Sequence, residues 1–210
     1  MSIENITDVW RTIYDELGIH MDNFEAIPAA SGVYAWFYPL YVKPDFDDFI
    51  EDIRKVHLYN AWTKGPLHLE DKDPLPRIGW FSVKRTIQLE NPPVDVRELR
   101  EAWETLKGND DDFFKLRQVF MRASLLMPPL YVGKAGKLNE RCNAHIRGAS
   151  QFAKRYQARA QELKLRCRKV KDLILLTLKT PPIEEEGGAA AEDLVERILN
   201  LVARPPYGMK

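Results

Sequence analysis

The chain has 210 residues, of which 45% are hydrophobic and 30% charged, a composition typical of a globular protein and not of a disordered or fibrous one. Its 31 Lys and Arg residues balance 31 Asp and Glu residues, and no segment approaches the roughly 18 consecutive apolar residues of a membrane span. The opening run MSIENITDVWRTIYDEL carries acids where a signal peptide carries bases. We therefore expect a cytoplasmic protein that does not associate with membranes.

The first three fifths of the chain contain both clear and unclear secondary-structure signals. Apolar residues recur at helical spacing over residues 3–17, and the β-branched and aromatic run SGVYAWFY predicts a strand over 31–38. The region 39–127 does not follow the strand-and-helix pattern of the rest of the chain. Within it we predict a helix over 45–56, a strand over 80–89, and helices over 95–107 and 110–126.

The last third returns to a regular pattern. PPLYVGK predicts a strand over 128–134, and a basic helical stretch follows over 138–168. DLILLTLKT predicts an apolar strand over 172–180. The sequence AAAEDLVERILNLVAR predicts an amphipathic helix over 189–204, which ends before two prolines. Three strands surrounded by helices indicate an α/β or α+β domain.

Charge is distributed unevenly along the chain. Between Lys134 and Lys171 there are twelve Lys or Arg residues and only two acids, so this segment carries about +10 and the remainder about −10. Such segregation is typical of a face that binds a polyanion such as a nucleic acid. The alternative interpretation is an ordinary solvated helix surface.

Four short elements, taken together, resemble the GIY-YIG nucleases. These are GVY at 32–34, YVG at 131–133, Arg141 ten residues after Tyr131, and Glu196 nine residues before a proline. The run YVGKAGKLNER is similar to that of the nucleotide-excision-repair subunit of the family, and His145, four residues after Arg141, resembles the pair found in restriction-type members. Gly208 stands where the family often has Asn.

The resemblance implies a fold and a domain organisation. It implies a small three-stranded antiparallel sheet flanked by helices, with a large, mostly helical insertion between the first two core strands. We interpret residues 1–210 as a single domain with core segments 31–38 and 128–208, an inserted subdomain at 39–127, and an N-terminal helical extension at 1–30.

The resemblance also assigns roles to individual residues. It implies that Glu196 binds Mg²⁺ or Mn²⁺, that Arg141 binds the scissile phosphate, and that His145 positions water or phosphate. A single carboxylate suits Mg²⁺, which keeps most of its waters, and a guanidinium fork matches phosphate oxygens. Tyr34 and Tyr131 lie on adjacent strands of the implied fold. Tyr34 is the preferred general base, although a phenol needs a nearby metal or cation to lower its pKa from about 10.

The basic segment supplies the expected nucleic-acid contacts. Lys134 is expected to contact phosphate or perturb a tyrosine, and Phe152 and Tyr156 are expected to be core aromatics. The candidate phosphate-binding residues are Lys134, Lys137, Arg147, Lys154, Arg155 and Arg159, and the surface is extended by Lys164, Arg166, Arg168 and Lys169. The insertion at 39–127 is a candidate surface for a partner protein or for a second copy of the chain.

These inferences predict a magnesium-dependent DNA endonuclease, a hydrolase of phosphodiester bonds, with RNA not excluded as a substrate. The alternative is a catalytically inactive relative with the same fold, which binds nucleic acid together with a partner protein. A third interpretation is an interaction protein whose motifs are coincidental. That interpretation predicts that Glu196 lies far from Arg141 in space.

Overall fold

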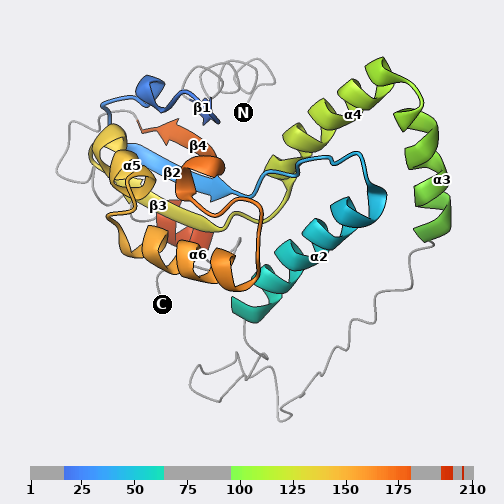
Figure 1. Ribbon diagram of the computed structural model, residues 1–210. Coiled ribbons are helices and arrows are strands. Elements are labelled where there is room, and N and C mark those ends of the chain that lie inside the picture. Colours follow the sequence, from blue (N-terminus) through green and yellow to red (C-terminus); the bar gives the residue numbers. More distant parts are fainter. Residues whose placement is uncertain (1–16, 64–95, 181–194, 201–204, 206–210) are drawn as a thin grey trace, which may run out of the picture.

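The computed structural model of the protein describes residues 17–63, 96–180, 195–200 and Pro205, which Figure 1 shows in colour. These residues form an α+β fold in which a four-stranded antiparallel sheet is flanked by helices. The strands are β1 (Leu17–His20), β2 (Gly32–Phe37), β3 (Tyr131–Ala135) and β4 (Ile174–Lys179), in the spatial order β1-β4-β2-β3. Among the described helices, none is both long and apolar enough to cross a membrane.

The sheet has one strand more than the sequence predicted. The predictions of strands near 31–38, 128–134 and 172–180 are confirmed as β2, β3 and β4. Leu17 was predicted to end a helix over 3–17 and Gly18–His20 to belong to the N-terminal helical extension, but Leu17–His20 form β1 and pair antiparallel with Leu175–Leu178 of β4. The pairing satisfies backbone groups that β4 would otherwise leave open at an edge of the sheet. Residues 3–16 of the predicted helix lie outside the described residues.

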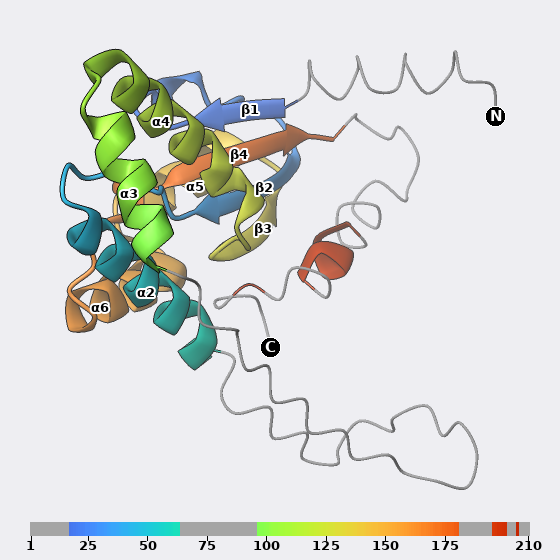
Figure 2. The same cartoon turned by 90° about the vertical axis from the view of Figure 1, so that its right-hand side faces the viewer.

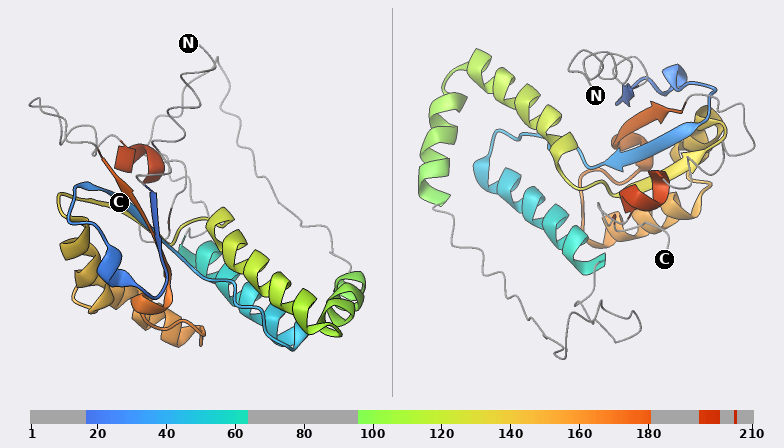
Figure 3. Two further views of the ribbon diagram at one scale, coloured as in Figure 1. Left: turned by 90° about the horizontal axis from the view of Figure 1, so that it is seen from above. Right: turned by 180° about the vertical axis from the view of Figure 1, so that it is seen from behind.

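The two faces of the sheet are covered by different parts of the chain. Side chains alternate along each strand, so Tyr34 and Trp36 of β2 share a face with their partners on β3, Gly133 and Tyr131. This face packs against α5 (Leu138–Ile146) and α6 (Gln151–Glu162) in the main apolar core. Figure 2 and the left panel of Figure 3 show the helical segment 195–200 on the opposite side of the sheet from α5 and α6.

The basic stretch predicted as one helix over 138–168 is two helices separated by a turn. α5 ends at Ile146, and Gly148 adopts a left-handed φ of 77°, a conformation that glycine reaches at little cost. Ser150 then caps α6, because its side chain accepts a hydrogen bond from the Ala153 amide. α6 ends at Glu162, and the described chain continues through η3 (Val170–Asp172) into β4. The break turns α6 back along the sheet.

The region 39–127 contains three described helices with an apolar cluster of their own. They are α2 (Phe46–Thr63), α3 (Val96–Lys107) and α4 (Asp110–Ala123), in agreement with the three predicted helices. Figures 1 and 3 show them extending from one end of the sheet. Buried Val42, Phe46, Phe49, Trp103 and Phe113 form their core. The predicted strand over 80–89 lies outside the described residues.

Two short 3-10 helices complete the described fold. η1 (Phe24–Ala26) follows β1 and precedes β2, and η2 (Ser124–Leu126) continues α4 toward β3. The buried Ser124 hydroxyl accepts a hydrogen bond from the Leu40 amide at 2.8 Å, which joins the two ends of the insertion. The Leu130 amide donates to the Trp36 carbonyl at 2.7 Å, so strand pairing begins directly where the insertion ends.

Candidate active site

The two tyrosines of the predicted site lie on neighbouring strands and their rings are close. Tyr34 on β2 is directly opposite Gly133 on β3, and the centroids of the Tyr34 and Tyr131 rings are 6.0 Å apart. A Cβ atom at Gly133 would lie 2.7 Å from the Tyr34 hydroxyl and 2.8 Å from Cε1 of Tyr131. Glycine is therefore the residue that allows the Tyr34 ring to lie across β3 beside Tyr131.

A chain of hydrogen bonds runs inward from Tyr34 through His145 to Ser150. The Tyr34 hydroxyl is 2.7 Å from Nε2 of His145, and Nδ1 of the same imidazole is 2.5 Å from Oγ of Ser150. His145 lies on α5, and Ser150 is the N-terminal cap of α6. One strand and two helices therefore meet at a single buried imidazole whose two nitrogens both have partners.

Burial controls the protonation of both titratable members of this chain. His145 is fully buried, which lowers its pKa to about 4, with a smaller contribution from the positive charge of Arg141. Tyr34 is 1% exposed, and burial raises its pKa well above its ordinary value. Arg141 acts on Tyr34 in the opposite direction but does not outweigh burial. At neutral pH the imidazole and the phenol are therefore both uncharged, and Arg141 by itself does not bring the phenol pKa below its ordinary value.

Arg141 is the charged group at the outer end of this chain. It lies one turn before His145 on α5, and its side chain is largely exposed. Hydrogen bonding with the Tyr34 hydroxyl is the largest cause of its raised pKa, and Tyr131 contributes in the same direction. A permanent cation thus lies beside two buried tyrosines, and because Arg141 itself is exposed, its remaining donors can reach an anion at the surface.

Aromatic rings surround the imidazole of His145. Tyr131 stacks on Phe152 with ring centroids 4.6 Å apart, and Phe152 meets the imidazole edge-on at 5.4 Å. Trp36 approaches the same imidazole edge-on at 6.2 Å. Phe152 and Tyr156 are buried, so the expectation that both are core aromatics is confirmed. The apolar surroundings explain why His145 resists protonation.

The structure brings Tyr34, Tyr131, Arg141 and His145 together, but it shows no such contact for Glu196. Glu196 is 7% exposed, and the helical segment 195–200 lies on the other side of the sheet (Figures 2 and 3). Within the described residues, no hydrogen bond or ion pair joins the Glu196 carboxylate to the other four side chains. Its backbone carbonyl accepts a hydrogen bond from the Asn200 side chain.

The candidate phosphate-binding residues are not all on one surface. Lys134 lies between Gly133 and Ala135 on β3 and so faces away from the Tyr34 ring. Lys137 forms an exposed ion pair with Glu140 at 2.8 Å, and Arg159 forms one with Glu162 at 2.5 Å. Arg147, Lys154 and Arg155 are exposed on or beside α5 and α6.

The cluster around Tyr34 is chemically suited to an anion and not to a divalent cation. It supplies phenols, a guanidinium and a neutral imidazole whose nitrogens are both engaged, whereas Mg²⁺ requires oxygen ligands such as carboxylates. Across the described residues, no group of three or more His, Cys, Asp or Glu side chains is arranged to hold a metal. Of the predicted site residues, Glu196 alone carries a carboxylate that fits Mg²⁺.

The chain was compared with protein-family models, curated proteins and solved structures. No family model, no curated protein and no solved structure matches the chain. Any assignment of function therefore depends on the chain's own residues and their arrangement.

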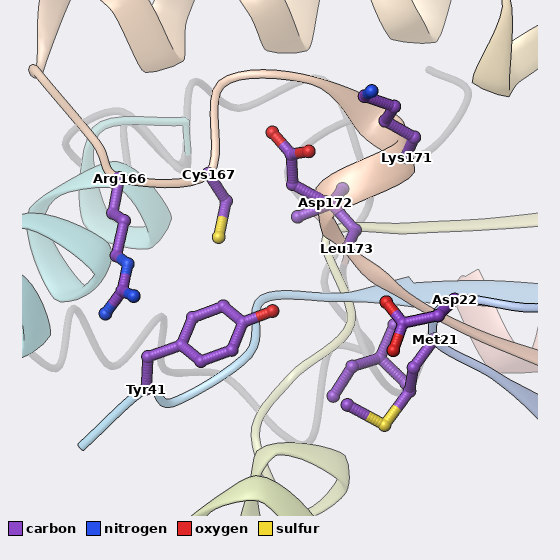
Figure 4. Close-up of a pocket in the computed structure, with 9 residues that line it drawn as sticks. Met21, Asp22, Tyr41, Arg166, Cys167, Lys171, Asp172 and Leu173 are labelled. Atoms are coloured by element: carbon purple, nitrogen blue, oxygen red, sulfur yellow. The ribbon is translucent and has the colours of Figure 1, made fainter.

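A separate cavity of about 430 Å³ lies at the start of β4, beside Ile174 (Figure 4). Met21 and Asp22, which follow β1, also line it. The Arg166 guanidinium lies over the Tyr41 ring at 4.6 Å on its rim. The carboxylates of Asp22 and Asp172 and the cations of Arg166 and Lys171 are mixed around it. None of the predicted catalytic residues lines this cavity, and its mixed charges favour no single class of ligand.

Sequence reasoning missed Ser150 and Trp36 as members of the site. Ser150 was hidden inside a stretch predicted to be one continuous helix, although the run Gly148-Ala-Ser150 before a new apolar repeat is a recognisable helix stop and restart. Trp36 was assigned to a strand, but its position two residues after Tyr34 already places it on the same face.

Proposed function

We propose that this protein is a metal-dependent endonuclease that hydrolyses phosphodiester bonds in DNA through a GIY-YIG-like active site. The single observation that carries the proposal is the buried chain Tyr34–His145–Ser150, which ends at the surface beside the guanidinium of Arg141. An acid–base chain that terminates at an exposed cation suits attack on a phosphate better than it suits packing alone.

In the proposed reaction, Arg141 binds the scissile phosphate and stabilises the charge that develops on its oxygens. Tyr34 accepts a proton from the attacking water while its own phenol proton passes to Nε2 of His145. The water oxygen forms a bond to phosphorus, the bond to the leaving oxygen breaks, and the leaving oxygen takes a proton from solvent. The proton on His145 then returns to the Tyr34 oxygen as the proton gained from water is released to solvent.

The bound phosphate itself favours this proton transfer. The positive charge of Arg141 is one of the two causes of the low His145 pKa. A phosphate dianion or diester paired with Arg141 offsets that charge, so the imidazole becomes a stronger base when substrate is present. Catalytic strength is thereby coupled to occupancy of the site.

Glu196 is the residue we propose for holding Mg²⁺ or Mn²⁺. Because segment 195–200 lies on the opposite side of the sheet from α5, an ion held by Glu196 would stabilise negative charge on the scissile phosphate only in an arrangement that brings Glu196 to Arg141. The electrostatic role of Arg141 and the proton chain of Tyr34 and His145 do not depend on the identity of that ion.

The proposal is tested by cleavage of supercoiled plasmid in the presence of Mg²⁺ or Mn²⁺, with EDTA as the metal-free control. Arg141→Ala and Glu196→Gln are each expected to abolish nicking and linearisation. Arg122→Ala, which removes an exposed arginine from α4 in the insertion, is the matched control and is expected to cleave like wild type. Cleavage that persists in Arg141→Ala would refute the assignment of the phosphate-binding residue. A parallel reaction with RNA of the same sequence defines the substrate class.

A second candidate function is a non-catalytic nucleic-acid-binding module with the same fold. The observation that favours it is burial, because Tyr34 and His145 expose 1% and 0% of their surfaces and a substrate must reach the phenol for chemistry to occur. If wild type and both active-site variants leave plasmid intact but shift DNA in a gel at low salt, this function replaces the first.

A further inference from the structure

Ser150 has two hydrogen-bond partners that belong to different helices. Its Oγ accepts the Ala153 amide at 3.1 Å, which caps α6, and it lies 2.5 Å from Nδ1 of His145 on α5. Ser150 is 8% exposed and His145 is fully buried, so neither interaction is replaced by bulk water. The side chain that starts α6 is therefore also the partner of the inner nitrogen of His145.

The hydrogen bonds of Tyr34 and Ser150 determine which nitrogen of His145 carries the hydrogen. A neutral imidazole has one donor nitrogen and one acceptor nitrogen, and a guanidinium only donates. Arg141 therefore cannot accept the phenol proton of Tyr34, and because Tyr34 is only 1% exposed, that proton needs another acceptor within the protein. Among the described residues, the hydrogen-bonding atom opposite that hydroxyl is Nε2 of His145. A buried hydroxyl donor is rarely left without an acceptor.

The position of the hydrogen on His145 also determines the direction of its hydrogen bond with Ser150. If Nε2 accepts from Tyr34, the hydrogen of the neutral ring is on Nδ1, and it points to Ser150. A serine oxygen has two lone pairs, so Oγ can accept from both Nδ1–H and the Ala153 amide. With the opposite tautomer, Ser150 would donate to Nδ1 and Nε2–H would donate to Tyr34, which leaves the phenol proton of Tyr34 without an acceptor among the described residues. The favoured tautomer instead leaves the hydroxyl proton of Ser150 unpaired, and Ser150 is the less buried of the two residues, at 8% exposed against 1% for Tyr34.

We propose that Ser150 is a positioning residue that holds His145 in the tautomer with hydrogen on Nδ1, so that Nε2 is the base for the Tyr34 hydroxyl. The catalytic consequence rests on the proposed nuclease function, whereas the tautomer itself is a property of the folded protein. Ser150 touches neither substrate nor phosphate in this proposal and acts only through His145.

The turn between α5 and α6 explains why this arrangement needs a break in the basic helical stretch. Five positions separate His145 from Ser150, which in a continuous helix would place the two side chains on different faces. The left-handed conformation of Gly148 instead folds the chain back and brings Oγ to the imidazole. The same turn is thus responsible for capping α6 and for orienting His145.

The first test measures the tautomer directly in the wild-type protein. Two-bond correlations of the ¹⁵N-labelled imidazoles distinguish a protonated from an unprotonated ring nitrogen, and His145→Gln identifies the His145 signals among those of the four histidines. We expect hydrogen on Nδ1 and a free Nε2 at pH 7. Hydrogen on Nε2 in wild type would overturn the proposal, whether or not the protein cleaves DNA.

The second test separates positioning from helix capping. Ser150→Ala removes both hydrogen bonds, and Asn109→Ala removes the corresponding cap of α4, where Asn109 accepts from the amides of Asp111 and Asp112. We expect Ser150→Ala to shift the His145 tautomer toward Nε2–H and to lower kcat about 10- to 100-fold, the range typical when a residue that hydrogen-bonds a metal-binding histidine is removed.

Controls make each outcome decisive. Asn109→Ala should leave both the tautomer and kcat unchanged, and Ser150→Thr, which keeps a hydroxyl, should restore the Nδ1–H signal. A wild-type tautomer in Ser150→Ala would refute the positioning role, and loss of the signal pattern in Asn109→Ala would assign the effect to stability alone. A correct tautomer shift in a protein that cuts neither DNA nor RNA would retain the positioning proposal and refute the nuclease.

Discussion

The apolar core between the sheet and helices α5 and α6 (the sheet core) contains buried polar side chains, whereas the core formed by α2, α3 and α4 (the insertion core) consists of apolar side chains. Beneath α5 and α6, the sheet core buries the hydroxyl of Tyr34, the imidazole of His145 and the hydroxyl of Ser150 among apolar side chains. The cluster formed by α2, α3 and α4 is built from aromatic and aliphatic residues, with Phe49 stacked on Trp103 at 4.8 Å. Polar groups in a core are costly unless they are hydrogen-bonded, so the sheet core depends on the bonds among Tyr34, His145 and Ser150, a requirement that the apolar insertion core does not have.

This difference indicates that the two regions are organised for different purposes. A core built for stability alone gains from apolar contacts, as in the insertion. A core that keeps a neutral histidine between a phenol and a serine has constraints that packing does not impose. Perturbing each region should therefore separate activity from stability.

The largest effect is expected for Tyr34→Phe. Removing the hydroxyl deletes the proton acceptor of the proposed reaction, and the loss in kcat should be about 10²- to 10⁴-fold, the usual contribution of general acid–base catalysis. The free energy of unfolding should fall by only about 1–3 kcal/mol, because Nε2 of His145 loses its partner while a ring of nearly the same shape remains in the core. Single-turnover cleavage measured beside urea denaturation compares the two. A large loss of stability with unchanged kcat would reverse our assignment of the sheet core.

Trp103→Ala should produce the converse result. Trp103 is 5% exposed and contacts Phe46, Phe49 and Phe113, so truncation leaves a cavity and should cost about 3–5 kcal/mol in unfolding free energy. At a temperature where the variant is still folded, the His145 tautomer should match wild type. Chemical denaturation measures the loss, and imidazole NMR checks the site. A changed tautomer would show that the two cores are coupled.

Acid should destabilise the sheet core through His145. Its folded pKa of about 4 lies below the ordinary 6.5, so the unfolded chain binds more protons between these values. Stability is complete above about pH 6.5 and is lost as the pH falls toward 4, by no more than about 3 kcal/mol for this group. Comparing the pH dependence of unfolding for wild type and His145→Gln cancels the contributions of His20 and of the carboxylates. Parallel pH curves would contradict the prediction.

The smallest effect is expected for Asn109→Ala in the insertion. The lost side-chain acceptor leaves two amides of the first turn of α4 to water, which should cost about 1 kcal/mol. The change should appear as a lower denaturation midpoint with an unchanged slope. A loss as large as that of Trp103→Ala would mean that α4 depends on its cap more than on its packing.

The sequence contained most of the information needed for the cluster around Tyr34. Glycine-flanked, β-branched runs predicted the two strands, and the four-residue spacing of Arg141 and His145 predicted that they share a helix face. Alternation along YVGK could also have shown that Lys134 points away from Tyr34, because it is an odd number of residues from Tyr131.

Other features depend on contacts that no local pattern shows. LGIH forms β1 because β4 supplies a partner across more than half of the chain, while its own sequence continues an apolar helical repeat. Ser150 becomes the partner of His145 only after α6 folds back beneath α5. The placement of segment 195–200 relative to Arg141 likewise follows from which face of the sheet it covers, and nothing in its composition specifies that face.

The hydrogen bonds at the two ends of the insertion bear on the order of folding. β2 and β3 pair residues roughly a hundred positions apart, and closing so long a loop carries an entropic cost before any contact offsets it. The bond from the Leu40 amide to the Ser124 hydroxyl joins the two ends of the insertion, and the bond from the Leu130 amide to the Trp36 carbonyl lies directly beside the last pair of the β2–β3 ladder. An insertion that condenses first therefore acts as a long-range tether, and the β2–β3 pair then closes with the kinetics of a hairpin.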